Sequence, residues 1–396
     1  MMMMMMVMMM LLSSATRLRP EDFGAKGNGL HNDTRAFMKT LEACETKGGC
    51  EIVLTSKKTY LTGPLSLISN LTLHIEDLAT LQSMSREHWL ENEWKNEAFL
   101  TAYYQTNLRI EGGGTIDGNG SEWWNHTKDD RHYRPHLFKL HTINRLSIDG
   151  VRFSNSANHH VYVENCTNVR VRNILVEAPS TSPNTDGINF SGGRDQLLED
   201  SHISNGDDCI SVVCDNANQT SRHDDMGYGG NVHVKNVTCV HGHGISIGSV
   251  RHGVVRNVTM ENITLWYAEN GPRIKTYPNN TGLVSDITYR NIRLHDVERG
   301  LFINGEYCPK SQSPYPCPPG KNSVLIENVL FEDIRGSVNS ADGIVGSFNC
   351  SSLNPCKNIA LRDIDLTTTS TQSPASFQCS YISGPDSHSV SPESCI

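Results

Sequence analysis

The chain has 396 residues, charged residues make up 19% of them, and the formal net charge is −9 at pH 7, with an isoelectric point near 6.0. This length allows one large domain or two ordinary ones, and the acidic balance argues against a nucleic-acid partner without excluding a polyanion held by a local basic patch. Beyond the N-terminus no apolar run approaches the roughly 20 residues of a membrane-spanning helix, so the sequence excludes a membrane protein.

The N-terminus begins with an apolar stretch, MMMMMMVMMMLL, which the small residues SSA follow. This arrangement is typical of a secretory signal peptide, here with cleavage near Ala15, although the usual basic residues are missing. The competing interpretation is a gene-model artefact upstream of the true start. In either case we exclude residues 1–16 from the fold and expect residues 17–396 to form a single domain.

Cysteine usage favours an exported protein. The chain has 12 cysteines, none in a C-x-x-C zinc spacing, and the short loops between neighbours suit disulfides of an oxidising compartment. N-glycosylation sequons, among them Asn70, Asn165, Asn236 and Asn349, agree with this. We therefore predict a secreted, extracellular protein with disulfides between close neighbours: Cys44 with Cys50, Cys308 with Cys317, Cys350 with Cys356, and Cys379 with Cys395.

The one convincing helix covers residues 32–48, NDTRAFMKTLEACETKG. Asp33 or Thr34 is the expected N-cap, and Phe37, Leu41 and Cys44 fall on one face at helical spacing. We expect this helix to cover the open end of a stack of strands, where unpaired edges otherwise invite aggregation.

A short pattern of two strands then recurs along the chain, at residues 107, 144, 168, 231, 283, 324 and 358. In the copy NVRVRNILVEAPS, Val169 and Val171 share one parity while Ile174 and Val176 share the other, which a strand, a one-residue bend and a second strand would explain. Such repeats indicate a solenoid, and we predict an all-β right-handed parallel β-helix. A β-sandwich would need hairpin turns between most strand pairs, and such turn sequences are scarce here. The asparagines that recur through the repeats are expected to form stacks that satisfy the hydrogen bonds of the turns.

Five short stretches carry the candidate functional residues. They are separated by 21 to 36 residues, each about one coil, and strands of successive coils lie about 4.8 Å apart. All five therefore fall on one lateral face, as in a groove for a linear polymer. They are SPNTDGINF with Asp186, NGDDCIS with Asp207 and Asp208, GHGISIGS with His243, GPRIKT with Arg273 and Lys275, and NGEYC with Tyr307.

Within GPRIKT, the strand period of two turns Arg273 and Lys275 to one side and Ile274 to the core. Two cations beside three carboxylates suit the binding of an anionic substrate group. The carboxylates suit cleavage of a glycosidic bond, which requires one protonated acid and one ionised base. Because crowded carboxylates resist ionising together, we expect repulsion to raise the pKa of Asp207 and keep its proton available for donation.

The motifs NTDG, GDDC, GHGISIGS and RIKT occur in the order and spacing of the polygalacturonases, family 28 of the glycoside hydrolases, which the chain resembles from about residue 20 to its C-terminal region. FGAKGNGLHNDTRAF, residues 23–37, is similar to the opening segment of the wider group of pectin-degrading β-helix enzymes. The resemblance implies a cell-wall hydrolase that cleaves α-1,4-linked galacturonan with inversion and without a metal or other cofactor. It also implies that Cys209 pairs with Cys239.

Carried over by motif, the resemblance implies a role for each candidate residue. Asp207 is the general acid, while Asp186 and Asp208 position and deprotonate the attacking water. The remaining residues flank the acid or bind substrate: His243 tunes the acid or shapes the subsite, Asn184 orients the first carboxylate, Arg273 and Lys275 bind the galacturonate carboxylate, and Tyr307 packs against or hydrogen-bonds the sugar.

Two longer excursions, residues 119–136 and 214–230, are expected to wall the groove. In the family that the chain resembles, a stretch like the WW…RP of residues 119–136 is more typical of exo-acting enzymes. Trp123 and Trp124 are expected either to stack on sugar or to anchor the loop.

Three other functions stay open. A calcium-dependent pectate lyase would need clustered acidic ligands and a basic proton abstractor. A rhamnogalacturonan or xylogalacturonan hydrolase is chemically closer, but the Arg273–Lys275 pair favours uniform galacturonan. A carbohydrate-binding β-helix without catalysis is disfavoured because all three carboxylates are kept. The expected partner is a pectic polysaccharide bound by a monomer, with no nucleic acid, membrane or cofactor.

Overall fold

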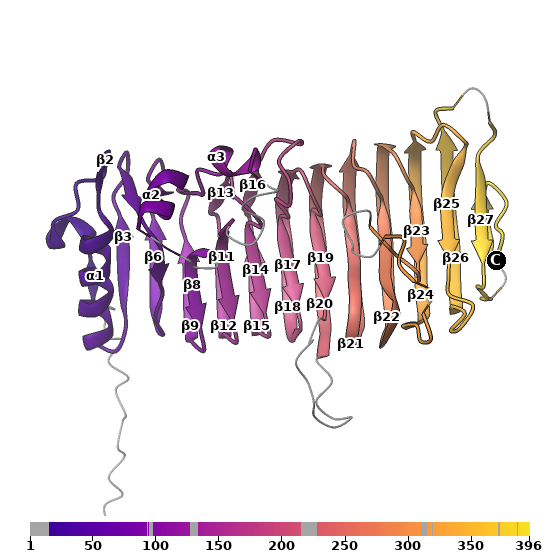
Figure 1. Ribbon diagram of the computed structural model, residues 1–396, viewed down its shortest axis with the longest axis horizontal. Helices are drawn as coiled ribbons and strands as arrows, with labels where there is room; N and C mark the ends of the chain where they lie inside the picture. The colour runs from indigo at the N-terminus through magenta and orange to yellow at the C-terminus, as the bar shows by residue number, and fades with distance from the viewer. Residues whose placement is uncertain are drawn as a thin grey trace, which may run out of the picture.

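The computed structural model describes residues 16–92, 94, 98–126, 134–214, 228–309, 315–318, 320–370, 373–385 and 387–396. These residues form 28 strands, three α-helices and the 3-10 helix η1 (Pro20–Phe23), and the strands wind along one axis into an elongated solenoid (Figure 1). Strands of successive coils pair in parallel. The prediction of an all-β parallel β-helix is confirmed, whereas residues 1–15 of the predicted signal peptide lie outside the described residues.

One ladder of parallel strands carries the candidate functional residues, and we call it the site ladder. Its strands stack in register from coil to coil, as Val161 with Ile188 and Ile188 with Ile210. The strands that belong to it alone are β5 (Leu65–Ser66), β8 (Ala98–Tyr103), β11 (His136–His141), β14 (Val161–Glu164), β17 (Ile188–Ser191), β19 (Ile210–Val213), β23 (Leu301–Asn304), β25 (Ile344–Asn349) and β27 (Ser376–Ser380).

Two further ladders complete each coil. The second contains β1 (Arg17–Leu18), β3 (Cys50–Leu54), β6 (Leu71–Ile75), β9 (Thr106–Glu111), β12 (Asn144–Asp149) and β15 (Thr167–Arg172). The third contains β2 (Asn28–Asn32), β4 (Thr59–Thr62), β7 (Thr80–Ser83), β10 (Thr115–Asp117), β13 (Arg152–Ser154) and β16 (Leu175–Glu177), and β28 (His388–Ser391) pairs with β26 in both the second and the third ladder. From the middle of the chain on, longer strands continue through more than one ladder: β18 (Gly193–Asn205), β20 (Tyr228–His241), β21 (Ile245–Trp266), β22 (Pro272–Val297), β24 (Leu325–Val338) and β26 (Lys357–Thr368).

Asparagines at the bends between strands adopt left-handed backbone conformations. Asn168 (φ 57°) is the second residue of β15, and Asn173 (φ 53°) directly follows this strand, so the apolar parity switches after Asn173 as predicted. Their side-chain amides donate to Asn144 Oδ1 at 3.0 Å and to Asp149 Oδ1 at 2.8 Å in the preceding coil. Similar bonds build two asparagine ladders further along, which confirms the prediction of stacked asparagines: Asn231 to Asp195, Asn257 to Asn231, Asn236 to Asp200, Asn262 to Asn236 and Asn291 to Asn262.

Helix α1 (Thr34–Thr46) covers the N-terminal end of the solenoid, where it packs against η1, β3, β4 and β5 (Figure 1). Phe37, Leu41 and Cys44 are buried, as the helical spacing predicted. Asp33 occupies the N-cap position, but its carboxylate accepts two backbone N–H groups of the preceding loop, at 2.8 and 2.9 Å, instead of those of the helix. Asp33 therefore ties the loop to the start of the helix.

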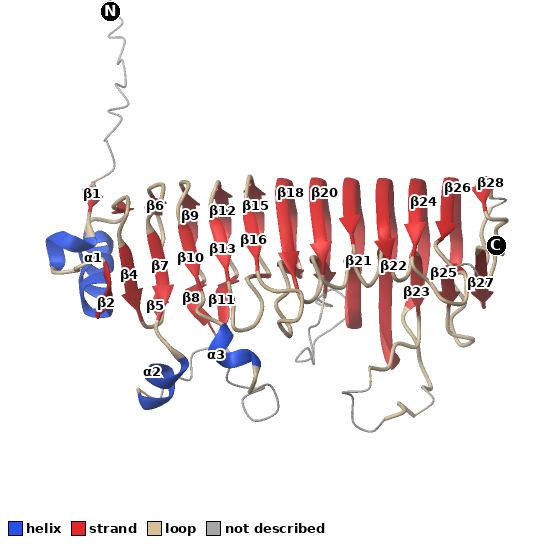
Figure 2. Ribbon diagram, turned by 90° about the horizontal axis from the view of Figure 1, so that it is seen from above, coloured by secondary structure: helices blue, strands red, loops and turns tan. Residues whose placement is uncertain are grey.

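Two shorter helices, α2 (Arg86–Glu91) and α3 (Ser121–Trp124), project from one side of the solenoid (Figure 2). Each lies in a connection that leads from the third ladder to the site ladder, between β7 and β8 and between β10 and β11. Both helices therefore stand at the edge where strands of the site ladder begin. No helix in the described part of the chain has the length and apolar character to cross a membrane.

The interior of the coils is filled with aliphatic and aromatic side chains. In the C-terminal half, the rings of Tyr289, Phe331, Phe348 and Phe377 follow one another at centroid distances of 5.4, 5.9 and 6.0 Å. Burial of such apolar surface stabilises a fold by roughly 25 cal/mol per Å². The core is thus a continuous stack that runs the length of the solenoid and holds successive coils in register.

Disulfides close short loops and brace one strand of the site ladder. The four pairs predicted between close neighbours all form. Cys209 also bonds Cys239, across 30 residues, as the resemblance implied. Cys166 remains a thiol, and burial raises its pKa to about 12, which makes it a poor nucleophile.

Candidate active site

Register in the site ladder aligns the candidate residues. Strands β17, β19 and β21 begin in register, and Asp186, Asp208 and His243 each lie two residues before one of them. These residues therefore occupy consecutive coils at one edge of the ladder, about 4.8 Å apart along the axis. Strand β22 pairs with β21 and brings Arg273 and Lys275 to the same side, which confirms the predicted alignment of the stretches.

Asp208 is the anion of a buried ion cluster. Arg273 Nη2 lies 2.6 Å from Oδ1, and Lys275 Nζ lies 2.8 Å from Oδ2. Ser246 Oγ donates to Oδ1 at 3.0 Å and accepts a bond of 3.0 Å from Arg273 Nε. Asp208, Arg273 and Lys275 are 4%, 4% and 7% exposed, and Ile274 is fully buried, as strand alternation predicted. Both cations neutralise Asp208, a partner that the sequence interpretation did not assign to them.

Asp207 turns to a different partner, His243. The ring Nδ1 lies 2.8 Å from Asp207 Oδ1, and Nε2 lies 3.2 Å from an oxygen of Glu269, whose other oxygen pairs with Arg299. Burial favours the neutral ring, but the hydrogen bond with Asp207 and the nearby carboxylates outweigh it and raise the pKa of His243. Burial likewise disfavours ionised Asp207, but the hydrogen bond and charge of His243 hold the pKa of Asp207 well below its usual range.

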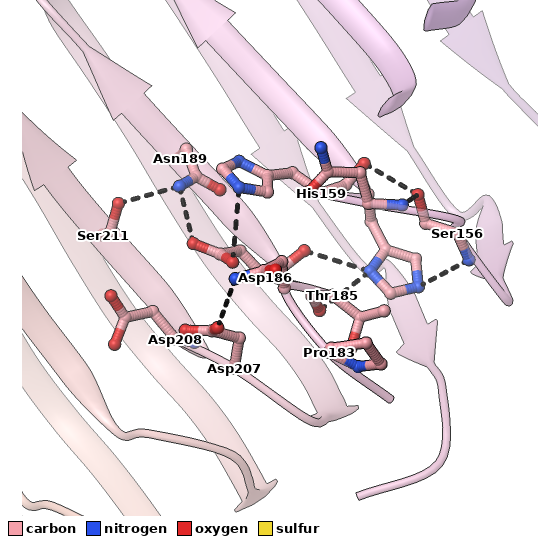
Figure 3. A network of polar contacts seen from close by, with 12 residues as sticks. Ser156, His159, Pro183, Thr185, Asp186, Asn189, Asp207, Asp208 and Ser211 are labelled. Atoms are coloured by element: carbon pink, nitrogen blue, oxygen red, sulfur yellow. Dashed lines mark hydrogen bonds and ion pairs between the residues drawn. The ribbon is translucent and has the colours of Figure 1, made fainter. Parts of the chain in front are cut away.

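Asp186 carries the raised pKa instead. Its side chain is 6% exposed, and its Oδ2 accepts the Asn189 amide at 2.9 Å (Figure 3). Burial, followed by the charges of Asp207 and Asp208, raises the pKa of Asp186 well above its ordinary value. The expectation that repulsion raises the pKa of Asp207 is therefore wrong. Repulsion acts on Asp186 because Asp207 has His243 as its counter-charge, whereas the bond from Asn189 is neutral.

Asn184 orients the carboxylate of Asp207. It sits in the left-handed region (φ 56°), and its amide donates to Asp207 Oδ2 at 3.2 Å. Its Oδ1 accepts a 2.6 Å bond from Arg134, which also donates to two backbone carbonyls. The resemblance assigned Asn184 to the first carboxylate, Asp186, and the structure corrects that assignment.

Tyr307 lies beside the cation pair. Lys275 Nζ stands 5.6 Å from the centroid of its ring, and the ring of Tyr277 lies 5.8 Å away, edge-on. The Tyr307 backbone N–H donates to the carbonyl of Thr276 at 2.9 Å. Tyr307 therefore lies next to the ion cluster, through the contact of its ring with Lys275.

One group of acids and histidine in the described residues has its potential ligand atoms within 4.8 Å of one another: Asp207, Asp208 and His243. Asp208 already faces Arg273 and Lys275, and Asp207 faces the imidazole. A divalent cation would have to displace these positive charges. The arrangement suits proton transfer between carboxyl and imidazole groups, and the metal-free reaction stays a prediction.

The sequence as a whole matches one known protein family. Residues 44–395 match the profile of the family described as Glycosyl hydrolases family 28. The chain belongs to this family. It is therefore a glycoside hydrolase, as the motifs implied. A probable polygalacturonase of Arabidopsis thaliana is 32% identical over 413 residues, covering 97% of this chain and 86% of the relative. Polygalacturonase-2 of Solanum lycopersicum is 32% identical over 358 residues, covering 87% and 73%.

Solved structures share the fold of this family 28 hydrolase. An exopolygalacturonase from Thermotoga maritima superposes with a TM-score of 0.78 at 19% identity, covering 92% of this chain and 89% of the other. An endo-xylogalacturonan hydrolase from Aspergillus tubingensis gives 0.76 at 21%, covering 94% and 98%. At these identities the likeness concerns the fold alone, and it does not separate exo-acting from endo-acting enzymes.

Several polar residues of the family 28 hydrolase site were missed from the sequence. Asn189, Ser211 and Ser246 stand in register with Arg273 on successive strands of the site ladder. Counting back one coil at a time from Arg273 would have found this column. Three others come from turns or from a more distant coil, where no such count applies: Arg134, His159 and Glu269.

The two excursions fall partly outside the described residues, which end at 126 and 214 and resume at 134 and 228. Within the first, Trp123 is 1% exposed and meets the ring of Trp89 edge-on at 6.2 Å. Trp124 Nε1 donates to the Ser156 carbonyl at 3.0 Å. These contacts favour loop anchoring over sugar stacking for both tryptophans. The predicted groove walls stay predictions.

Proposed function

We propose that this glycoside hydrolase is a secreted polygalacturonase that cleaves α-1,4-galacturonosyl linkages of pectin with inversion, as a monomer acting on the cell wall. The observation that carries the proposal is the cluster of Asp186, Asp207 and Asp208 beside the buried cations Arg273 and Lys275. A uronate polymer supplies the carboxylate that such cations bind. Relatives that bear the name polygalacturonase support this substrate class.

Asp207 and His243 together supply the proton for the leaving oxygen. In the free enzyme the proton resides on His243, whose Nδ1 lies 2.8 Å from the carboxylate. Transfer along this hydrogen bond turns Asp207 into the acid and leaves the ring neutral. The glycosidic oxygen then takes the proton from Asp207, and Asn184 keeps the carboxyl group oriented.

Asp186 and Asp208 act on the water. Asp186 is the stronger base of the site because its pKa is raised, and a base with a higher pKa takes a proton from water more readily. Asp208, paired with two cations, holds its charge in place and orients the water. The water attacks C1 opposite the leaving oxygen, its proton passes to Asp186, and the configuration at C1 inverts.

Arg273, Lys275 and Tyr307 form the binding side of the site. Each cation retains N–H groups beyond the bond it makes to Asp208, since a guanidinium has five and an ammonium has three. These groups bind the carboxylate of a galacturonosyl residue, and the Tyr307 ring beside Lys275 packs against the sugar. Neutral sugars lack the carboxylate, which explains a preference for galacturonan.

The proposal is tested with de-esterified homogalacturonan. New reducing ends should appear, proton NMR should detect the β-anomer as the first product, and a chelator should leave the rate unchanged. Absence of new reducing ends would reject hydrolysis of this polymer, and an unsaturated product absorbing in the ultraviolet would identify a lyase. Sizing the products of long and short oligogalacturonates distinguishes release of terminal units from internal cleavage.

Asp207→Asn should lower kcat by about 10² to 10⁴-fold, because the variant loses general acid catalysis. Asp22→Asn is the matched control, since Asp22 lies exposed in η1 at the N-terminal end. Near-ultraviolet circular dichroism of both variants should match the parent. Parent-like turnover by Asp207→Asn would remove this residue from the mechanism.

A further inference from the structure

His159 stands beside the base of the proposed reaction. It lies two residues before β14, in register with Asp186 on the next coil. Its Nε2 lies 3.6 Å from Asp186 Oδ1, slightly beyond hydrogen-bond distance, while the other oxygen of that carboxylate accepts the Asn189 amide at 2.9 Å. Figure 3 shows the imidazole and the amide converging on the two oxygens of Asp186. Each oxygen of the Asp186 carboxylate therefore faces a different nitrogen, Nε2 of His159 for Oδ1 and the amide of Asn189 for Oδ2.

The surroundings of the ring decide where its proton lies. Nδ1 of His159 is buried without a hydrogen-bond partner, and the ring packs against His136 at 4.7 Å and Tyr162 at 5.6 Å. A neutral imidazole has one N–H. Placing it on Nε2 directs it toward Asp186, whereas placing it on Nδ1 would bury a donor that has no acceptor. The geometry thus favours the Nε2–H tautomer.

We propose that His159 is a positioning residue for the proposed hydrolysis, which orients Asp186 for water activation by offering Nε2–H as a neutral donor. The inference rests on the proposed function, because it assumes that Asp186 receives the proton of the attacking water. A donor without a full charge fixes the carboxylate and preserves its basicity, whereas a cation in this place would weaken the base.

Burial keeps the His159 ring neutral at working pH. Burial is the main influence, and it lowers the pKa of His159 to about 4. The acids Asp207 and Asp208 oppose this effect, while Arg134 and Lys139 add to it. On the strands packed against the ring, His136 has its own pKa lowered by burial, Lys139 Nζ lies 5.6 Å from the centroid of the Tyr162 ring, and Glu164 pairs with Lys139 at 3.6 Å.

The adjacent histidine has a different role. The ring of His160 is fully buried, and its Nδ1 lies 3.2 and 3.0 Å from the carbonyls of Thr185 and Asp186. Its Nε2 accepts the Ser156 N–H at 3.4 Å. His160 therefore holds the backbone of the turn, while His159 contacts the carboxylate side chain that the turn presents.

Variants of His159 separate positioning from folding. His159→Leu removes the donor and should lower kcat about 100-fold with KM within about twofold, since misplacement of a reacting group costs about this much. His159→Gln keeps a neutral N–H donor and should recover at least part of the loss. His159→Lys should move the acidic limb of the pH–rate profile to lower pH, because the added cation lowers the pKa of Asp186. His233→Leu, on β20 beside Glu261, is the control.

The expected pattern of kcat and pH–rate profiles supports the proposal only if the circular dichroism of each variant matches that of the parent protein. Equal kcat in His159→Leu and the parent would overturn it, and so would an unmoved acidic limb in His159→Lys. Nitrogen-15 NMR of labelled histidines gives a readout that needs no substrate: Nε2 of His159 should be protonated at pH 6, and Asp186→Asn should change its titration. A proton on Nδ1 of His159 would refute the proposal for His159 even if the enzyme cleaves galacturonan. A proton on Nε2 would support the proposed tautomer even if the enzyme does not cleave galacturonan.

Discussion

The Cys209–Cys239 disulfide should stabilise the fold more than the Cys350–Cys356 disulfide. Both pairs are almost completely buried, so replacing them with alanine leaves comparable small cavities. They differ in the loop that they close, which spans 30 residues for the first pair and 6 for the second. The comparison therefore isolates the effect of loop length.

The magnitude follows from the entropy of loop closure in the unfolded chain. A loop of about 30 residues corresponds to about 3.6 kcal/mol at 25 °C, and one of about 6 residues to about 2.2 kcal/mol. Cys209→Ala/Cys239→Ala should thus lose about 1.4 kcal/mol more than Cys350→Ala/Cys356→Ala. Only the first should also lower kcat, because Cys209 directly follows Asp208 in the turn that carries the acids.

Reversible unfolding in urea measures the two losses under the same conditions, with the parent protein as reference. Equal losses for the two double variants would refute the argument from loop length, as would a larger loss for the Cys350–Cys356 pair. Turnover of galacturonan oligomers is measured in parallel. A parent-like kcat in the Cys209–Cys239 double variant would mean that the turn holds its geometry without the bond.

Two further predictions concern the asparagine ladders and the site's response to pH. Asn262→Ala should cost about 2 kcal/mol, because it breaks exposed bonds to Asn236 and Asn291 and places alanine at φ 56°. Asn262→Gly should cost less, since glycine tolerates that angle. The stability that His243 and its partner Asp207 contribute should be greatest between about pH 4 and 6.5. Asp207, with its lowered pKa, loses its contribution as the pH falls, and His243, with its raised pKa, as the pH rises.

Both predictions are checked by urea unfolding. For the asparagine, a larger loss in Asn262→Gly than in Asn262→Ala would contradict the role assigned to the left-handed angle. For the pH dependence, His243→Gln is compared with the parent at pH 5.5 and pH 9. The difference in unfolding free energy should shrink at the higher pH, and a constant difference would contradict the ion pair.

Local patterns in the sequence predicted most of the fold. The parity switch after Asn173, the apolar face of residues 32–48 and the short cysteine spacings each depend on neighbours a few residues apart, and each is confirmed. The placement of Asp186 and His243 at one edge followed from the coil spacing alone. A solenoid repeats the same step, so a rule for one coil extends to all of them.

The charge pairing of the site could not be predicted in the same way. Asp207 and Asp208 are adjacent, yet one turns to His243 and the other to Arg273 and Lys275. Which side each residue faces depends on the backbone of a turn, and turns follow no fixed period. The proton was therefore assigned to Asp207, whereas burial and the charges of Asp207 and Asp208 raise the pKa of Asp186 instead.

Helix α1 affects whether copies of the chain can join end to end. At the opposite end, β27 pairs with β25 and β28 pairs with β26, beside the Cys379–Cys395 bond, and neither strand has a second partner among the described residues. A chain without α1 would present a bare first coil whose parallel edge complements that last coil. Copies could then join head to tail, and because a solenoid advances along its axis, such joining never closes into a ring. The helix therefore covers one of the two strand edges that such head-to-tail joining requires.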